Sequence, residues 1–438
     1  ARKATGSAAY EAQIGFRAGE PDVLVTSDLR GMAFDLPAPL AKPTDAAWPL
    51  RYESGAVAGA TGRLRHRVAV ADQLTLELER DAASGRVQRG VIGVGPQAQQ
   101  QLVLPASGVV ARVNLPRLQT DVWETALAKL FGDDTAAAAR ADGGFVPTAW
   151  SLRVGELQVD ERTLHDVLAS GTRDGATWRA DVQARELAGR VEYSDGGSDR
   201  AGKVVARLSR LSIPAGSVGE DESMLARPPA NMPALDVVVE QFELRGKKLG
   251  RLEIEAVNHD VAAARQTSAL QEWELKKLAV RAPEATFVAS GQWAALVRGA
   301  PPPLDPRAPR ERGDPRRTAL DFKLDIRDAG ALLARLDMPG VLARGKGTME
   351  GSLDWRGAPL SPHYPSMAGK VHLDIGAGQF LKADPGVAKL LGVLSLQSLP
   401  RRLTLDFRDV FSAGFAFDFI RGDVDVARGI ATTNNLQM

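Results

Sequence analysis

The chain has 438 residues, of which 44% are hydrophobic and only 5% aromatic, so it can bury a large, mostly aliphatic surface. Its 55 lysines and arginines are balanced by 54 aspartates and glutamates, and the resulting net charge of +1 argues against a nucleic-acid partner. Cysteine is absent, which excludes disulfides, thiolate metal sites and cysteine nucleophiles, and suits any compartment, including an oxidising one.

Strict alternation of apolar and polar residues is the main pattern along the chain. It begins at Leu74, Leu76 and Leu78 and recurs in many later segments, of which Leu320–Ile326 is the clearest. One side of each segment is apolar and the other is charged, which is typical of antiparallel sheets with one wet face. The sequence therefore predicts a mainly β protein, and residues 1–119 form the first β segment.

The best early helix signal lies in residues 120–145, which we interpret as a helical insertion. Asp121 and Glu124 have the spacing of a capping box. Trp123, Leu127, Leu130 and Phe131 then form one apolar stripe, and Gly132 ends it.

Residues 146–298 contain an internal repeat with an offset of 85 residues. The apolar pattern from Trp150 to Val167 returns from Leu235 to Leu252. The repeat also bears on the segment from Leu164 to Ser170, which fits either a helix or a strand. Its counterpart, Leu249 to Ala256, alternates strictly, so we expect both to be strands.

The segment 299–317 is rich in proline and arginine and is predicted to be a solvated loop. Residues 318–438 form a C-terminal β region with short helices near 328–337 and 385–399. Asp328 is a candidate cap for the first helix, and Asp384 followed by Pro385 for the second. The second helix is apolar on more than one face, so it could close the end of the sheet, plug a groove or lie at a membrane interface.

No arrangement of residues indicates catalysis or a bound cofactor. The five histidines show no metal-ligand spacing, and the chain has neither a GxSxG motif nor a phosphate loop ending in GK[ST]. Asp406, Asp409 and Asp418 could pair in a glycoside hydrolase, but alternation places Asp406 on a solvated face. We therefore expect a protein that is not an enzyme and holds no metal.

Several motifs resemble the YhdP family of AsmA-like proteins from Gram-negative bacteria. They are LLGVLSLQSLPRRLTLDFRDVFSAGFAFD (Leu390 to Asp418), GQFLKADPG (Gly378 to Gly386), LDWRGAP (Leu353 to Pro359), LDIRDAGALLARL (Leu324 to Leu336), ASGQW (Ala289 to Trp293) and LPAPLAK (Leu36 to Lys42). The resemblance implies an elongated, twisted β sheet curled into an open apolar groove. It also implies a periplasmic protein that is anchored to the inner membrane and carries phospholipid to the outer membrane.

The chain itself contains no apolar run of the roughly 18 residues that a membrane helix needs, and no signal peptide. Because it begins with Ala1 and its strand pattern continues to Met438, we expect a segment of a longer protein, with the anchor outside it.

Alternation alone leaves the role of the apolar faces open. They could form the core of a closed β sandwich, a structural or protein-binding module, or they could line a lipid groove. The family resemblance favours the groove. A lipid with about 30 chain carbons would then be shielded from a cost on the order of 20 kcal/mol for exposing its methylenes to water.

On this interpretation, alternation assigns inward-facing lipid contacts, and a register error would move a whole strand's set together. The predicted contacts are Val237, Val239, Leu252, Ile254, Phe322, Leu324, Leu373, Ile375, Leu403, Leu405, Phe407, Phe415 and Phe417. Arg401 and Arg402 either contact a lipid phosphate or begin a surface strand.

Overall fold

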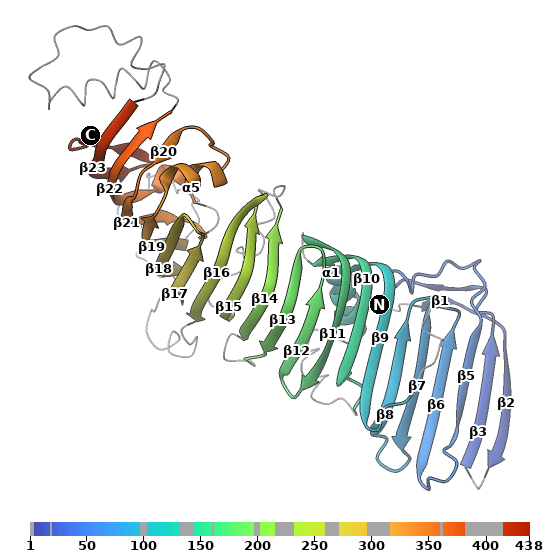
Figure 1. Ribbon diagram of the computed structural model, residues 1–438. Helices are drawn as coiled ribbons and strands as arrows, with labels where there is room; N and C mark the ends of the chain where they lie inside the picture. Colours follow the sequence, from blue (N-terminus) through green and yellow to red (C-terminus); the bar gives the residue numbers. More distant parts are fainter. Residues whose placement is uncertain are drawn as a thin grey trace, which may run out of the picture. The chain divides into compact units, whose positions relative to one another are not determined.

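The computed structural model is mainly β, with its strands side by side in twisted sheets (Figure 1). It describes residues 4–17, 20–96, 103–131, 144–159, 162–196, 202–214, 232–258, 271–295, 316–359, 362–381 and 415–438. The motif from Leu390 to Asp418 lies mostly outside these ranges. So do the predicted second helix and the candidate residues Arg401, Arg402, Leu403, Leu405 and Phe407.

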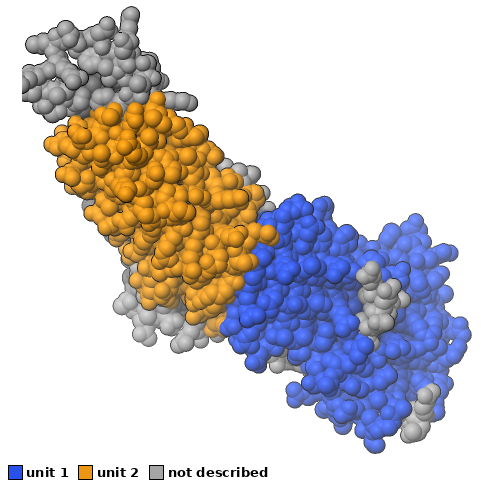
Figure 2. Space-filling model, viewed as in Figure 1, with its two compact units in different colours: residues 1–192 blue, residues 193–438 orange. Residues whose placement is uncertain are grey.

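The chain divides into two compact units, residues 1–192 and 193–438 (Figure 2). The first unit contains β1 (Ala4–Gly6), β2 (Tyr10–Arg17), β3 (Glu20–Ser27), β4 (Met32–Phe34), β5 (Leu50–Ala56), β6 (Arg63–Val70), β7 (Leu74–Asp81), β8 (Val87–Val94), β9 (Gly108–Gln119), α1 (Thr120–Phe131), β10 (Ala149–Val159), β11 (Arg162–Asp174) and β12 (Thr177–Gln183). The next strand, β13 (Leu187–Ser194), contains the boundary between the units.

The second unit has a similar composition, with one short α-helix among its described residues. It contains β14 (Lys203–Ile213), β15 (Ala234–Leu244), β16 (Lys247–Asn258), β17 (Gln271–Arg281), β18 (Ala285–Ala295), β19 (Arg316–Ile326), α5 (Ala329–Arg335), β20 (Leu342–Arg344), β21 (Gly347–Arg356), the 3₁₀ turn η2 (Tyr364–Ser366), β22 (Ala368–Phe380), β23 (Phe415–Ala427) and β24 (Ile430–Thr432).

Strand pairing within each unit is sequential and open. In the first unit β2 pairs with β3, and β3 with β5. The order then continues through β12, and no described pairing returns to β2. In the second unit the order runs from β14 to β19 and then through β21, β22, β23 and β24. The predicted mainly β fold with few short helices is confirmed.

Among the described strand pairings, three are parallel, which the predicted antiparallel sheet did not include. They are β8 with β9, β9 with β10 and β14 with β15. Parallel neighbours need a connection of about a dozen residues or more. The chain supplies such connections between Val94 and Gly108, between Gln119 and Ala149, and between Ile213 and Ala234.

The hairpins β10–β11 and β15–β16 begin 85 residues apart at both strands. Val154 pairs with Val167 in the first hairpin, and Val239 pairs with Leu252 in the second. All four side chains are buried. The segment from Leu164 to Ser170 lies within β11, so its strand prediction is confirmed.

The two α-helices of the described residues begin close to their predicted positions. In α5 the Asp328 carboxylate caps the helix by accepting a hydrogen bond of 2.9 Å from the Ala331 amide, as the sequence predicts. Helix α1 begins at Thr120, so Asp121 lies in its first turn and does not cap it. A carboxylate there still interacts favourably with the positive end of the helix dipole.

Candidate functional site

The second unit has one apolar sheet face, on which side chains of neighbouring strands form continuous rows. The central row consists of Leu208, Val239, Leu252, Val280, Phe287, Leu324, Met349 and Leu373, each directly opposite the next across a strand pair. Eight strands at roughly 4.8 Å spacing make this row about 34 Å long.

A second row runs beside the first, two residues further along each strand. It consists of Ala206, Val237, Ile254, Leu278, Ala289, Phe322, Gly351, Val371 and Val424. Phe322 stacks on Phe287 of the central row with ring centroids 6.1 Å apart. Its direct neighbours across the strands, Ala289 and Gly351, are both small.

The degree of burial along the rows differs from that of a closed core. Val239 and Leu252 are buried, but Val237, Ile254, Phe322, Leu324 and Leu373 are only half-buried. In a sandwich, a second sheet would cover such side chains. Here the long strands of the unit are joined edge to edge into a single sheet, so part of the apolar face stays accessible.

One long edge of this face is covered by α5, and we call it the helix edge. Ile326, Ala329, Leu342 and Phe417 form a buried cluster there, with Ile375 packed against it. The Arg335 side chain of α5 pairs with the buried Glu284 and also donates to the Lys248 carbonyl. Phe417 packs on Phe380 at 5.2 Å, while β23 places Phe415 opposite Phe380 in the ladder.

The opposite face of the sheet is charged. Arg317 pairs with Asp354 at 2.7 Å, and Arg421 with Asp374 at 2.9 Å. Glu253 accepts hydrogen bonds from Lys277 and Arg281, which lower the pKa of its carboxyl to about 2. This separation of charge from apolar surface confirms the alternation in the sequence.

The Glu253 cluster predicts a specific acid sensitivity. Because its folded pKa is depressed below the ordinary 4.5, the stability it contributes is complete above pH 4.5 and is lost as pH falls towards 2. We expect Glu253→Gln to flatten the dependence of unfolding free energy on pH in this window, measured by urea unfolding. The matched control is Glu255→Gln, an exposed carboxylate on the same strand face, which should keep the wild-type slope. An unchanged slope in Glu253→Gln would contradict the assignment.

The first unit repeats this division between faces. A row of Val25, Tyr52, Val68, Leu76, Ile92, Ala111 and Trp150 crosses its strands on the apolar face. On the other face, Glu79 is fully buried between Arg65 and Arg89, each 2.6 Å from it. Hydrogen bonds from Arg89 and then Arg65 hold the pKa of the Glu79 carboxyl below its usual range, against an opposing effect of burial.

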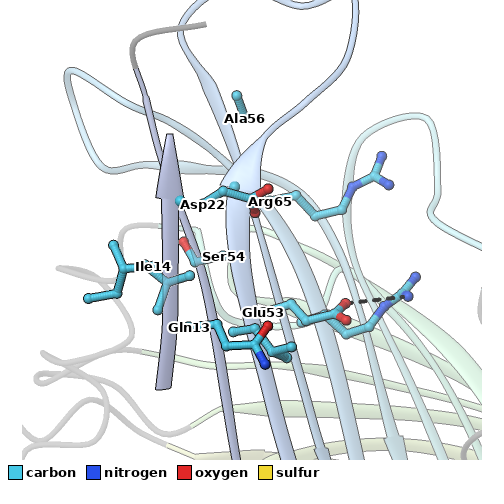
Figure 3. Close-up of a pocket in the computed structure, with 12 residues that line it drawn as sticks. Gln13, Ile14, Asp22, Glu53, Ser54, Ala56 and Arg65 are labelled. Atoms are coloured by element: carbon cyan, nitrogen blue, oxygen red, sulfur yellow. Dashed lines mark ion pairs between the residues drawn. The ribbon is translucent and has the colours of Figure 1, made fainter. Parts of the chain in front are cut away.

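Close to the edge strand β2 lies a small polar pocket, shown in Figure 3. Glu53 and Arg67 both line it, with 3.9 Å between the carboxylate and the guanidinium. Asp22 and Arg65 also line the pocket, and the lack of a side chain at Gly55 leaves room for the Asp22 carboxylate. The charged side chains of its lining suit an acyl chain poorly.

The described residues contain no group of three or more histidines and carboxylates that could hold a metal ion. Within the same ranges, no helix is both long and apolar enough to cross a membrane.

A family model described as YhdP protein matches this chain over residues 1–438. The chain belongs to the YhdP family. One curated relative is the intermembrane phospholipid transporter YhdP of Escherichia coli (strain K12), which is 23% identical over 98% of this chain. The chain spans 32% of the length of that relative. No solved structure matches the chain.

Four of the YhdP-like motifs lie wholly within the described residues, and two of these border the apolar face. Leu324 to Leu336 covers the end of β19, the Asp328 cap and α5, so this motif builds the helix edge. Leu353 to Pro359 covers the end of β21, where the Trp355 indole donates a hydrogen bond of 3.0 Å to the Ala358 carbonyl. Both motifs therefore lie at the borders of the apolar face.

Several row residues were missed by sequence reasoning. Leu208, Val280, Phe287 and Met349 complete the central row. In β17 a bulge between Leu275 and Leu278 breaks the alternation of apolar and polar residues. For this reason, the sequence pattern does not show that Val280 lies on the apolar face. In β18 the exposed Val288 makes both faces look apolar, although Phe287, Ala289 and Trp293 do alternate.

Proposed function

We propose that this chain is a periplasmic segment of a bridge-like protein that carries phospholipids along an apolar groove between the inner and outer membranes. Its anchor in the inner membrane would be a helix outside this segment. The observation that carries the proposal is the pair of continuous apolar rows in the second unit, in which residues such as Ile254, Phe322 and Leu373 are only half-buried. The name of the Escherichia coli relative supports phospholipid as the cargo.

Physically, a row of this kind lowers the barrier to lipid transfer. Each methylene costs about 0.8 kcal/mol to expose to water, and an apolar row shields many of them at once. Aliphatic contacts are not directional, so a chain can slide from one strand to the next without breaking specific bonds. Movement would be passive diffusion, with its direction set elsewhere, and no bond of the lipid would be made or broken.

The predicted contacts remain Val237, Val239, Leu252, Ile254, Phe322, Leu324, Leu373 and Ile375, joined by Phe415 and Phe417 near the helix edge. Of these, Phe322 is half-buried, so part of its ring is accessible to an acyl chain. Leu403, Leu405 and Phe407, with Arg401 and Arg402 as headgroup contacts, stay predictions from the sequence.

Native mass spectrometry of the purified chain, followed by lipid extraction, tests the proposal. We expect bound phospholipid with mixed acyl chains, because burial does not discriminate strongly between chain lengths. A folded chain that binds no phospholipid, even after incubation with phosphatidylglycerol in detergent, would refute the groove and favour a structural module.

A further inference from the structure

In each unit, one long edge of the apolar face carries tryptophan and arginine, and we call it the tryptophan edge of that unit. In the second unit it lies opposite the helix edge. In the second unit it is formed by Trp273, Trp293 and Trp355, with the Arg316 guanidinium 5.6 Å from the Trp293 ring centre. In the first unit the Arg173 guanidinium lies 5.4 Å from the Trp178 ring centre. The internal repeat relates the two edges. Arg173 pairs with Trp178 across the strands, and Asn258, 85 residues further along the chain, pairs with Trp273 in the same way.

Arg80 lies on the same edge of the first unit. It follows Leu74, Leu76 and Leu78 on the apolar side of β7. Across the strands, Leu78 lies opposite Gly90, and Gly90 lies opposite Val109. The Val109 carbonyl accepts a hydrogen bond from the Thr148 amide, and the Thr148 carbonyl accepts one from the Arg173 amide. Arg80 and Arg173 therefore lie along one edge, four strands apart, or roughly 19 Å at 4.8 Å per strand.

The charges of these two arginines are not neutralised by the described residues. No carboxylate in the described ranges forms an ion pair with Arg80 or Arg173, whereas arginines such as Arg65, Arg67, Arg89 and Arg179 on the charged face all have one. A half-buried cation on an apolar surface is costly unless an anion accompanies it. The structure therefore leaves two positive positions beside an apolar path.

Buried polar atoms without partners gather on this same edge. Six buried side-chain nitrogen or oxygen atoms have no hydrogen-bond partner among the described residues, and five of them lie on the apolar face near the tryptophan edge: His66 Nε2, Arg80 Nε, Trp150 Nε1, Arg173 Nε and Trp293 Nε1. Most buried polar atoms in proteins are paired, so such a concentration points to a missing ligand. His66 is already fixed by Tyr52, whose hydroxyl lies 3.0 Å from His66 Nδ1.

We propose that the tryptophan edge holds the phosphate headgroup of a bound phospholipid, with Arg80 and Arg173 as two successive contacts, while the acyl chains lie on the apolar rows. This inference rests on the proposed function and adds the orientation of the lipid. Arginine binds phosphate through two parallel hydrogen bonds, and tryptophan suits a boundary between apolar and wet surroundings. In the second unit the helix edge is packed with apolar side chains, and its Arg335 is already paired with Glu284.

The test compares dipalmitoyl phosphatidylglycerol with dipalmitoylglycerol, which has the same chains but no phosphate. Each lipid is offered in detergent to the full chain, and bound lipid is counted by native mass spectrometry. We expect the wild type to prefer phosphatidylglycerol by at least 10-fold. The double variant Arg80→Gln/Arg173→Gln should lose about 10-fold of this preference and still bind dipalmitoylglycerol as well as the wild type.

The matched control is Arg179→Gln/Arg190→Gln, which removes two charges from the opposite face of neighbouring strands and should keep the preference. Arg80→Lys/Arg173→Lys should restore part of it, because the charge returns without the paired hydrogen bonds. An unchanged preference in the glutamine double variant would overturn the headgroup assignment alone. Absence of both lipids from the wild type would overturn the groove and the headgroup assignment together.

Discussion

Replacing Phe322 by aspartate should remove most of the bound phospholipid from the chain and leave the sheet folded. The side chain is half-buried between Ala289 and Gly351, so a carboxylate there can reach water when the groove is empty. When an acyl chain lies over it, the carboxylate loses this water without gaining a partner, which costs several kcal/mol. We expect lipid occupancy to fall more than 10-fold, measured by native mass spectrometry.

The control for this change is Val288→Asp, which introduces the same charge on the neighbouring strand but on the opposite face. Val288 is 40% exposed and lies opposite Lys323, so the new carboxylate meets water and a cation. Lipid occupancy in this variant should equal that of the wild type. If Phe322→Asp instead unfolds the second unit while Val288→Asp does not, Phe322 belongs to a packed core and the groove interpretation fails at this position.

Replacing Glu79 by glutamine should destabilise the first unit by about 3 kcal/mol. Its carboxylate has no exposed surface and joins Arg65 and Arg89 from the two neighbouring strands. Glutamine keeps the shape but removes the anion that pairs with Arg89, and it leaves Arg65 with Glu77 alone, 3.6 Å away. The measurement is hydrogen exchange of peptides from β6, β7 and β8, in which protection should decrease.

Glu53→Gln provides the comparison for Glu79. Its side chain is 35% exposed, and it pairs with Arg51 on its own strand, so solvent already weakens the interaction. We expect a loss below about 1 kcal/mol. Equal effects of the two substitutions would mean that burial of the Glu79 network adds nothing to stability.

Much of the apolar face could be predicted from local patterns. Alternation correctly separates Phe322 and Leu324 from Lys323 and Asp325, because successive side chains of a strand point to opposite faces. The Asp328 cap was predictable for a similar reason, since it involves residues only three positions apart. The facing of Val280 was not, because a bulge adds one residue to β17 and resets the alternation.

The sequence by itself determined that this is a mainly β protein with one apolar and one charged side on its strands. These features depend on interactions between residues that are close along the chain. Only the tertiary structure decided which strands are neighbours, that β9 lies parallel to β10, and that Arg80 and Arg173 share an edge. Those relations join residues up to about a hundred positions apart along the chain. Their positions depend on the register of every strand between them, and a local sequence pattern does not contain that information.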